Sequence, residues 1–151
     1  MRSRVNREAV LVIGYGSPLR GDDAAGLRAA RRLAHRGFHV LEVHQLTPEL
    51  AEHVARARVV FFLDAHAGLP PGEVSVEPLT CVPGRPAPLE HHASPAGLLR
   101  LARTAYGAEP TAWLIGIGGR DFDLSDRISP PAQKAVIRAI EEVIRCTNLV
   151  S

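Results

Sequence analysis

The stretch at residues 10–26, VLVIGYGSPLRGDDAAG, decides how the rest of the chain is interpreted. It opens with four aliphatic residues, and a run without a polar face is typical of a strand buried on both sides. Gly14, Gly16 and Pro18 end this run, and two aspartates then precede a segment for which we predict a helix over 24–36. A strand, a glycine-rich turn and a helix start form the first crossover of an open α/β sheet, where ligand sites usually lie. We therefore expect the chemistry of this protein in the turn.

The residues of this turn fit a cation better than a phosphate. A dinucleotide site has the pattern Gly-x-Gly-x-x-Gly, but the third glycine position is occupied here by Leu19. Asp22 and Asp23 put two negative charges where the phosphates would lie, and like charges about 4 Å apart repel by several kcal/mol at an intermediate dielectric. Glu42, at the end of the next predicted strand, could still serve as the ribose-binding acid. A nucleotide-binding α/β enzyme therefore stays open as an alternative.

Composition and charge predict one globular domain over residues 1–151. The chain is 46% hydrophobic with a net charge of +2, and aromatic residues make up 5% of it. Its basic residues are scattered, which gives no support for nucleic-acid binding, and no apolar run approaches the length of a membrane span or a signal peptide. Cys81 and Cys146 lie far apart in the sequence, as expected of free thiols in a reducing compartment. We expect a cytoplasmic monomer that binds neither nucleic acid nor membranes.

Strand and helix patterns alternate along the rest of the chain. We predict further strands over 38–43, 59–63, 73–77 and 112–117, and further helices over 48–56, 95–106 and 131–145. Each of these helices follows an N-cap residue and a proline, at Thr47-Pro48, Ser94-Pro95 and Ser129-Pro130. The strand at 73–77 alternates apolar and polar residues and is expected at an edge. The predicted fold is a single three-layer α/β/α domain with a mostly parallel sheet of about five strands.

Three candidate ligands should meet at one edge of this sheet. Ligands of open α/β sheets bind outside the carboxyl ends of the strands, where neighbouring connections go to opposite faces. If the first and third strands are neighbours, the glycine turn and Asp64 emerge side by side. The loop before the helix at 95–106 contains His91 and His92. This loop needs only to fold over the same edge to bring a histidine to the carboxylates. Two carboxylates and one imidazole suit a divalent transition metal with open positions for water or substrate.

Several stretches of the chain together resemble the hydrogenase maturation proteases. The turn at 14–26, GYGSPLRGDDAAG, is similar to the family signature G-x-G-N-x-L-x-x-D-[DE]-x-x-G. The further similar stretches, in family order, are VFFLDA at 60–65, HHASP at 91–95, WLIGIG at 113–118, Leu124 and ISP at 128–130. This resemblance covers most of the chain. It implies an endopeptidase that removes a C-terminal extension from the large-subunit precursor of a nickel-iron hydrogenase after nickel insertion.

The resemblance also implies which residues act. Asp23, Asp64 and His91 correspond to the family residues that recognise nickel in the client complex, and they could bind another divalent metal in vitro. Asp23 and Asp64 would be the catalytic pair, with His92 as the alternate metal ligand. The turn itself would be shaped by Gly14, Gly16, Ser17, Asp22 and Gly26, where Ser17 departs from the usual asparagine of the family.

The resemblance leaves two mechanisms and one further function open. The metal could polarise the scissile carbonyl and activate water, or it could serve recognition only while a carboxylate acts as general base. The alternative function is a nickel-sensing assembly chaperone that uses the same residues without cleavage.

Overall fold

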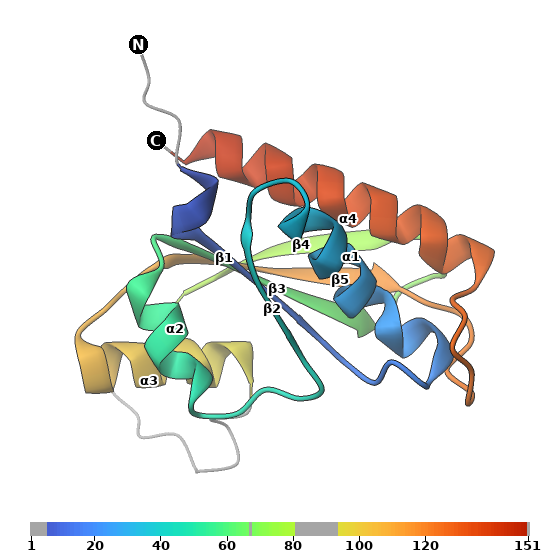
Figure 1. Cartoon of the computed structure of the whole chain (residues 1–151), viewed down its shortest axis with the longest axis horizontal. Coiled ribbons are helices and arrows are strands. Elements are labelled where there is room, and N and C mark those ends of the chain that lie inside the picture. Colours follow the sequence, from blue (N-terminus) through green and yellow to red (C-terminus); the bar gives the residue numbers. More distant parts are fainter. Residues whose placement is uncertain (1–5, 67, 81–93, 151) are drawn as a thin grey trace.

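A computed structural model describes residues 6–66, 68–80 and 94–150 and shows a three-layer α/β/α fold (Figure 1). Its sheet has five strands in the order β2-β1-β3-β5-β4. The strands are β1 (Val10–Tyr15), β2 (His39–Val43), β3 (Val59–His66), β4 (Val74–Leu79) and β5 (Thr111–Gly118). The helices are η1 (Arg7–Ala9), η2 (Gly21–Ala24), α1 (Ala25–Ala34), α2 (Leu50–Arg56), α3 (Pro95–Tyr106) and α4 (Pro130–Leu149), with η1 and η2 of the 3-10 type. The predicted fold class is confirmed.

The sheet is parallel except at one edge. β1 pairs in parallel with both β2 and β3, and β3 pairs in parallel with β5. β4 pairs with β5 in the antiparallel direction and lies at the edge, as the alternating pattern at 73–77 predicts. Within the described part of the chain, none of the helices combines the length and the apolar character needed to cross a bilayer.

Helices cover both faces of the sheet, α1 and α4 on one and α2 and α3 on the other (Figure 1). Along β1, Val10 and Val12 pack toward α1 and α4, whereas Leu11 and Ile13 pack toward α2 and α3. Successive side chains of a strand point to opposite faces, so a strand between two helical layers has to be apolar at every position. This requirement explains the aliphatic run that begins β1.

Several predicted boundaries are wrong. β4 continues to Leu79 and α4 to Leu149, beyond the predicted ends at 77 and 145. β3 continues through Asp64 to His66 because β5 supplies backbone partners as far as Gly118, so Asp64 lies inside the strand and not after it. α1 starts only at Ala25 because the residues before it form the 3-10 turn η2. α2 starts at Leu50, whose N–H donates to the Thr47 carbonyl at 3.1 Å, and the Thr47-Pro48 pair forms a turn instead of the cap.

Serine caps position the other two predicted helices as expected. The Ser94 hydroxyl accepts the Gly97 N–H at 3.0 Å at the start of α3. The Ser129 hydroxyl accepts the Ala132 N–H at 3.4 Å at the start of α4. Cys146 is a buried free thiol in α4, whereas Cys81 lies outside the described residues.

Two glycines allow α1 to lie directly on the sheet. A Cβ atom at Gly14 would be 2.5 Å from the Gly26 carbonyl oxygen and 2.6 Å from the Ala30 Cβ. A Cβ atom at Gly26 would collide with the carbonyl oxygen of Leu63 in β3. Since both obstacles include backbone atoms, close contact between helix and sheet accounts for the two glycines without a bound phosphate.

Replacing Gly26 by alanine should therefore destabilise the protein. An alanine within a helix is ordinarily more favourable than glycine by about 1 kcal/mol, but here the added methyl group meets the backbone of β3. We expect the free energy of unfolding in urea to fall by about 1–3 kcal/mol, as in other overpacked cores. Arg32→Ala, at an exposed position of the same helix, is the control and should change it by less than about 0.5 kcal/mol. A more stable Gly26→Ala protein would contradict the packing argument.

Candidate active site

An open cleft of about 390 Å³ lies at the carboxyl ends of β1, β2 and β3. The register of the sheet places Tyr15 of β1 beside Asp64 of β3. The cleft is lined by Tyr15, Gly16, Ser17, Asp23, His44, Gln45, Leu46 and Asp64. The helix after β1 (α1) and the helix after β2 (α2) pack on opposite faces of the sheet, so the cleft occupies the switch point of the fold. The predicted meeting of the glycine turn with Asp64 is confirmed.

Asp23 enters the cleft from η2 and closes the glycine turn. Its Oδ2 accepts the N–H of Ser17 at 2.7 Å. Gly16, the residue before Ser17, has a φ of 143°, and a Cβ atom there would collide with the Asp23 carbonyl oxygen. The turn therefore needs glycine at this position, and it directs the Ser17 amide to a carboxylate of the protein itself.

These contacts weaken the nucleotide alternative. The Ser17 amide, which a phosphate would need, is already bound to Asp23. Glu42, the candidate ribose-binding acid, forms an ion pair with Arg31 at 3.0 Å. Gly14 and Gly26 are accounted for by the packing of α1 on the sheet.

Asp64 is half-buried in the floor of the cleft, and its pKa is raised to about 6. Burial is the main cause, and the negative charge of Asp23 adds to it, while a hydrogen bond from the Tyr15 hydroxyl and the proximity of His66 act in the opposite direction. Burial and the Asp64 charge also raise the pKa of Tyr15, so this hydroxyl remains a neutral donor. A carboxyl group that titrates near neutral pH is suited to proton transfer.

Sequence reasoning missed Tyr15 as a residue of the site, although a signal for it was present. In β1, Leu11 and Ile13 pack toward α2 and α3, and Tyr15 follows at the same two-residue period. Phe62 and Asp64 follow the same alternation in β3. Since β1 and β3 are adjacent, this period alone directs the tyrosine and the aspartate to the same face.

The predicted histidine ligands, His91 and His92, lie outside the described residues, so the three-ligand site stays a prediction. Within 6–66, 68–80 and 94–150, no group of three or more His, Cys, Asp or Glu side chains is arranged to hold a metal. The structure does bring the two predicted carboxylates, Asp23 and Asp64, to one cleft.

A second, smaller cavity lies beside Asp64. It measures about 120 Å³ and is lined by Asp64, His66, Leu69, Ser75, Glu77, Leu114 and Gly116. The exposed His66 turns back on its own chain, with its Nδ1 accepting the Gly68 N–H at 2.8 Å. Asp64 therefore lines two cavities, one on the side of the glycine turn and one on the side of β4.

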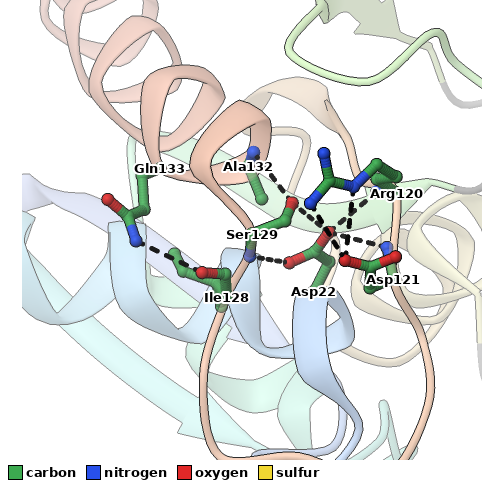
Figure 2. Close-up of polar contacts among 7 residues, drawn as sticks. All are labelled: Asp22, Arg120, Asp121, Ile128, Ser129, Ala132 and Gln133. Carbon is green, nitrogen blue, oxygen red and sulfur yellow. Dashed lines mark hydrogen bonds and ion pairs between the residues drawn. The ribbon is translucent and has the colours of Figure 1, made fainter.

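Asp22 is fully buried and does not line the cleft. Its carboxylate points toward Ser129, Arg120 and Asp121 (Figure 2). Its carboxylate accepts the Ser129 N–H and hydroxyl, both at 2.6 Å, and the N–H groups of Arg120 at 2.7 Å and Asp121 at 2.9 Å. Burial alone would raise the pKa of Asp22, but these four hydrogen bonds outweigh it and hold the pKa below its usual value. Asp22 belongs to the turn, as predicted. The expectation that its charge, like that of Asp23, lies where a phosphate would bind was wrong, because Asp22 binds the loop before α4.

Solved structures similar to this chain include hydrogenase maturation proteases. The [NiFe] hydrogenase maturation protease HybD from Thermococcus kodakarensis is 28% identical with a TM-score of 0.72, over 91% of this chain and 98% of that one. A hydrogenase 2 maturation peptidase from Thaumarchaeota archaeon SCGC_AB-539-E09 is 25% identical with a TM-score of 0.66, over 93% and 98%. The hydrogenase maturating endopeptidase HybD from E. coli, at 21% identity, shares the fold with a TM-score of 0.74 over 91% and 90%.

Comparison with protein-family models gives no match, and neither does comparison with curated protein sequences. The similarity to the solved structures nevertheless spans nearly the whole chain and confirms the resemblance that the sequence indicates.

Replacing Asp22 by asparagine should destabilise the protein at neutral pH. The side chain keeps its shape but loses its charge, and its amide group then faces N–H donors, so we expect a loss of about 2–4 kcal/mol in the free energy of unfolding. Because the folded pKa of Asp22 is lowered, its contribution is present above the unfolded pKa and is lost as the pH falls through the folded value. The difference from wild type, measured by urea unfolding, should therefore be largest near pH 7 and shrink below about pH 4. Asp123→Asn, at an exposed position of the same loop, is the control. Equal losses of stability in the two variants would show that the hydrogen bonds of Asp22 do not stabilise the fold.

Replacing Asp64 by asparagine should have the opposite effect on stability. The folded pKa is raised to about 6, so ionised Asp64 destabilises the folded state above that pH and ceases to do so as the pH falls toward its unfolded pKa. At pH 8 we expect the Asp64→Asn variant to unfold with a free energy roughly 1–3 kcal/mol higher than wild type. Urea unfolding at pH 8 and near pH 4.5 measures this difference, which should be much smaller at the lower pH. If the Asp64→Asn variant is less stable than wild type at pH 8, the charge of Asp64 does not destabilise the folded state.

Proposed function

We propose that this chain, a peptidase of the hydrogenase maturation protease type, removes a C-terminal extension from the large-subunit precursor of a nickel-iron hydrogenase after nickel has been inserted. The observation that carries the proposal is the pair of carboxylates, Asp23 and Asp64, in one open cleft at the switch point of the fold. The pair occurs in a chain that is 28% identical to a [NiFe] hydrogenase maturation protease over 91% of its length.

The electrostatics of the cleft favour a divalent cation. The negative charge of Asp23 raises the pKa of Asp64, because the two carboxylates repel each other across the cleft. A divalent ion between them would turn this repulsion into attraction, and oxygen ligands from two acids together with an imidazole suit a metal such as nickel. We propose that Asp23, Asp64 and His91, with His92 as the alternate, contact nickel that belongs to the substrate. Another divalent metal could take its place in vitro.

Asp64 is also the best placed group for proton transfer. With a pKa of about 6, it is mostly ionised at neutral pH and can take a proton from a water molecule that attacks the scissile carbonyl. The proton then passes to the leaving amine, which completes hydrolysis of the peptide bond. The Tyr15 hydroxyl donates to Asp64 and fixes the direction of its carboxylate. A bound metal would supply polarisation of the carbonyl.

The alternative is a nickel-sensing assembly chaperone that binds the precursor through the same residues and does not cleave it. We propose further that the protein acts as a cytoplasmic monomer. Both the peptidase and the chaperone need a cleft that can admit the C-terminal segment of a folded protein. The cleft is open to solvent, so such a segment can enter it.

The proposal is tested by mixing the purified protein with the large-subunit precursor of a nickel-iron hydrogenase from the same source, loaded with nickel or free of it. We expect mass spectrometry to show a loss confined to the C-terminus of the nickel-loaded precursor and no change in the nickel-free control. An unchanged mass in a stable complex would instead establish the chaperone. If neither cleavage nor binding is seen, the proposed function is wrong for this precursor.

The same assay separates the two mechanisms through Asp64→Asn. If Asp64 is the general base, this variant should still bind the nickel-loaded precursor but cleave it at least about 100-fold more slowly. If Asp64 serves mainly to recognise the metal, binding itself is lost. His91→Ala and His92→Ala, measured side by side, identify the histidine that contributes, and Glu141→Gln, at an exposed position of α4, is the acidic control.

A further inference from the structure

Two exposed leucines from distant parts of the sequence lie side by side next to the cleft. Leu19 is 59% exposed and Leu124 is 81% exposed, the highest value among the exposed large hydrophobic side chains of the described residues. Arg20 and Ser125, the residues that follow them, form a parallel β-bridge. The Ser125 N–H donates to the Leu19 carbonyl, and the Gly21 N–H donates to the Ser125 carbonyl, both at 2.9 Å. The bridge therefore places the two leucines at neighbouring positions of paired segments.

The backbone that carries these leucines is held firmly. Immediately after the bridge, the Asp22 N–H donates to the Asp121 carbonyl at 2.7 Å. The Asp22 side chain in turn accepts the N–H groups of Arg120 and Asp121 before Leu124, and that of Ser129 after it (Figure 2). Both ends of the loop are thus bound to the turn that contains Leu19. An apolar pair fixed in solvent in this way is typical of an interaction surface.

We propose that Leu19 and Leu124 form a docking surface for an apolar patch on the folded body of the hydrogenase precursor. This inference rests on the proposed function. Leu19 follows Ser17 by two residues and precedes Asp23 by four, and both of those residues line the cleft. The Leu19 N–H also donates to the Ser17 hydroxyl at 3.4 Å. The body of a protein substrate whose C-terminal segment enters the cleft can therefore contact Leu19. A second copy of this chain at the same place would obstruct the entry of the substrate.

The surroundings of the pair fit a protein partner better than a lipid surface. Exposed residues of both charge signs lie around it, among them Arg20, Asp121, Asp123 and Arg127. An apolar centre within a mixed polar rim is the usual anatomy of a protein–protein interface. A membrane-binding surface would instead be expected to carry a cluster of basic residues.

The experiment compares Leu19→Ser, Leu124→Ser and the double variant with wild type in cleavage of the nickel-loaded precursor. We expect KM to rise about tenfold or more in the double variant, while kcat stays within about twofold, because docking is lost and the cleft is unchanged. Leu149→Ser, at a 67% exposed leucine at the far end of α4, is the matched control and should leave both constants unchanged. Thermal unfolding of each variant checks that the fold is intact.

The outcomes separate the docking surface from the proposed function. If wild type cleaves the precursor and the double variant does so with unchanged KM, the docking surface is refuted and the protease stands. If wild type does not cleave the precursor, the proposed function fails and the docking surface falls with it. A wild-type dimer in sedimentation that the double variant dissociates, or wild-type binding to anionic vesicles that it loses, would show that another partner covers the leucines and would overturn the inference.

Discussion

The buried carboxylate of Asp22 is the interaction on which the rest of the site depends. A charge without solvent is costly unless hydrogen-bond donors surround it, and here four donors from the loop at 120–129 do so. One of the four is the hydroxyl of Ser129, which also caps α4. The Asp22 side chain therefore joins the turn between β1 and α1 to the loop before α4 and to the start of α4. The neighbouring Asp23 is thereby held on the opposite side, toward the cleft.

The glycines of the turn act together with the buried Asp22 carboxylate to shape the site. Gly14 and Gly26 let α1 lie against β1 and β3, so the turn between β1 and α1 stays close to the sheet. Gly16 then permits Asp23 to reach back to the Ser17 amide. The result is that a carboxylate from a turn and a carboxylate from β3 face each other across one cleft. The charge of Asp23 raises the pKa of Asp64, so the pair lowers the stability of the folded state, a cost that is common at active sites.

Much of this arrangement could be predicted because it depends on local patterns. Continuous aliphatic runs indicate strands between two helical layers, and serine-proline pairs mark the starts of α3 and α4. The meeting of Asp23 with Asp64 follows once β1 and β3 are neighbours. The burial of Asp22 could not be predicted in this way, since its partners are 98 to 107 residues away in sequence. The end of β3 was missed for the same reason, because the register of β5 determines it.

Three aspartates of similar chemistry thus have different roles, and the number of donors that each one meets explains the difference. A carboxylate offers about four acceptor positions. Asp22 meets four donors, three at Oδ2 and one at Oδ1, and its side chain is fully buried, so it is closed to a ligand. Among the described contacts, Asp23 meets the Ser17 amide and Asp64 meets the Tyr15 hydroxyl. Both therefore retain acceptor positions, and both face the cleft. The donors that the fold brings to Asp22 and Asp23, which are adjacent in sequence, thus place one carboxylate in the interior and leave the other in the cleft.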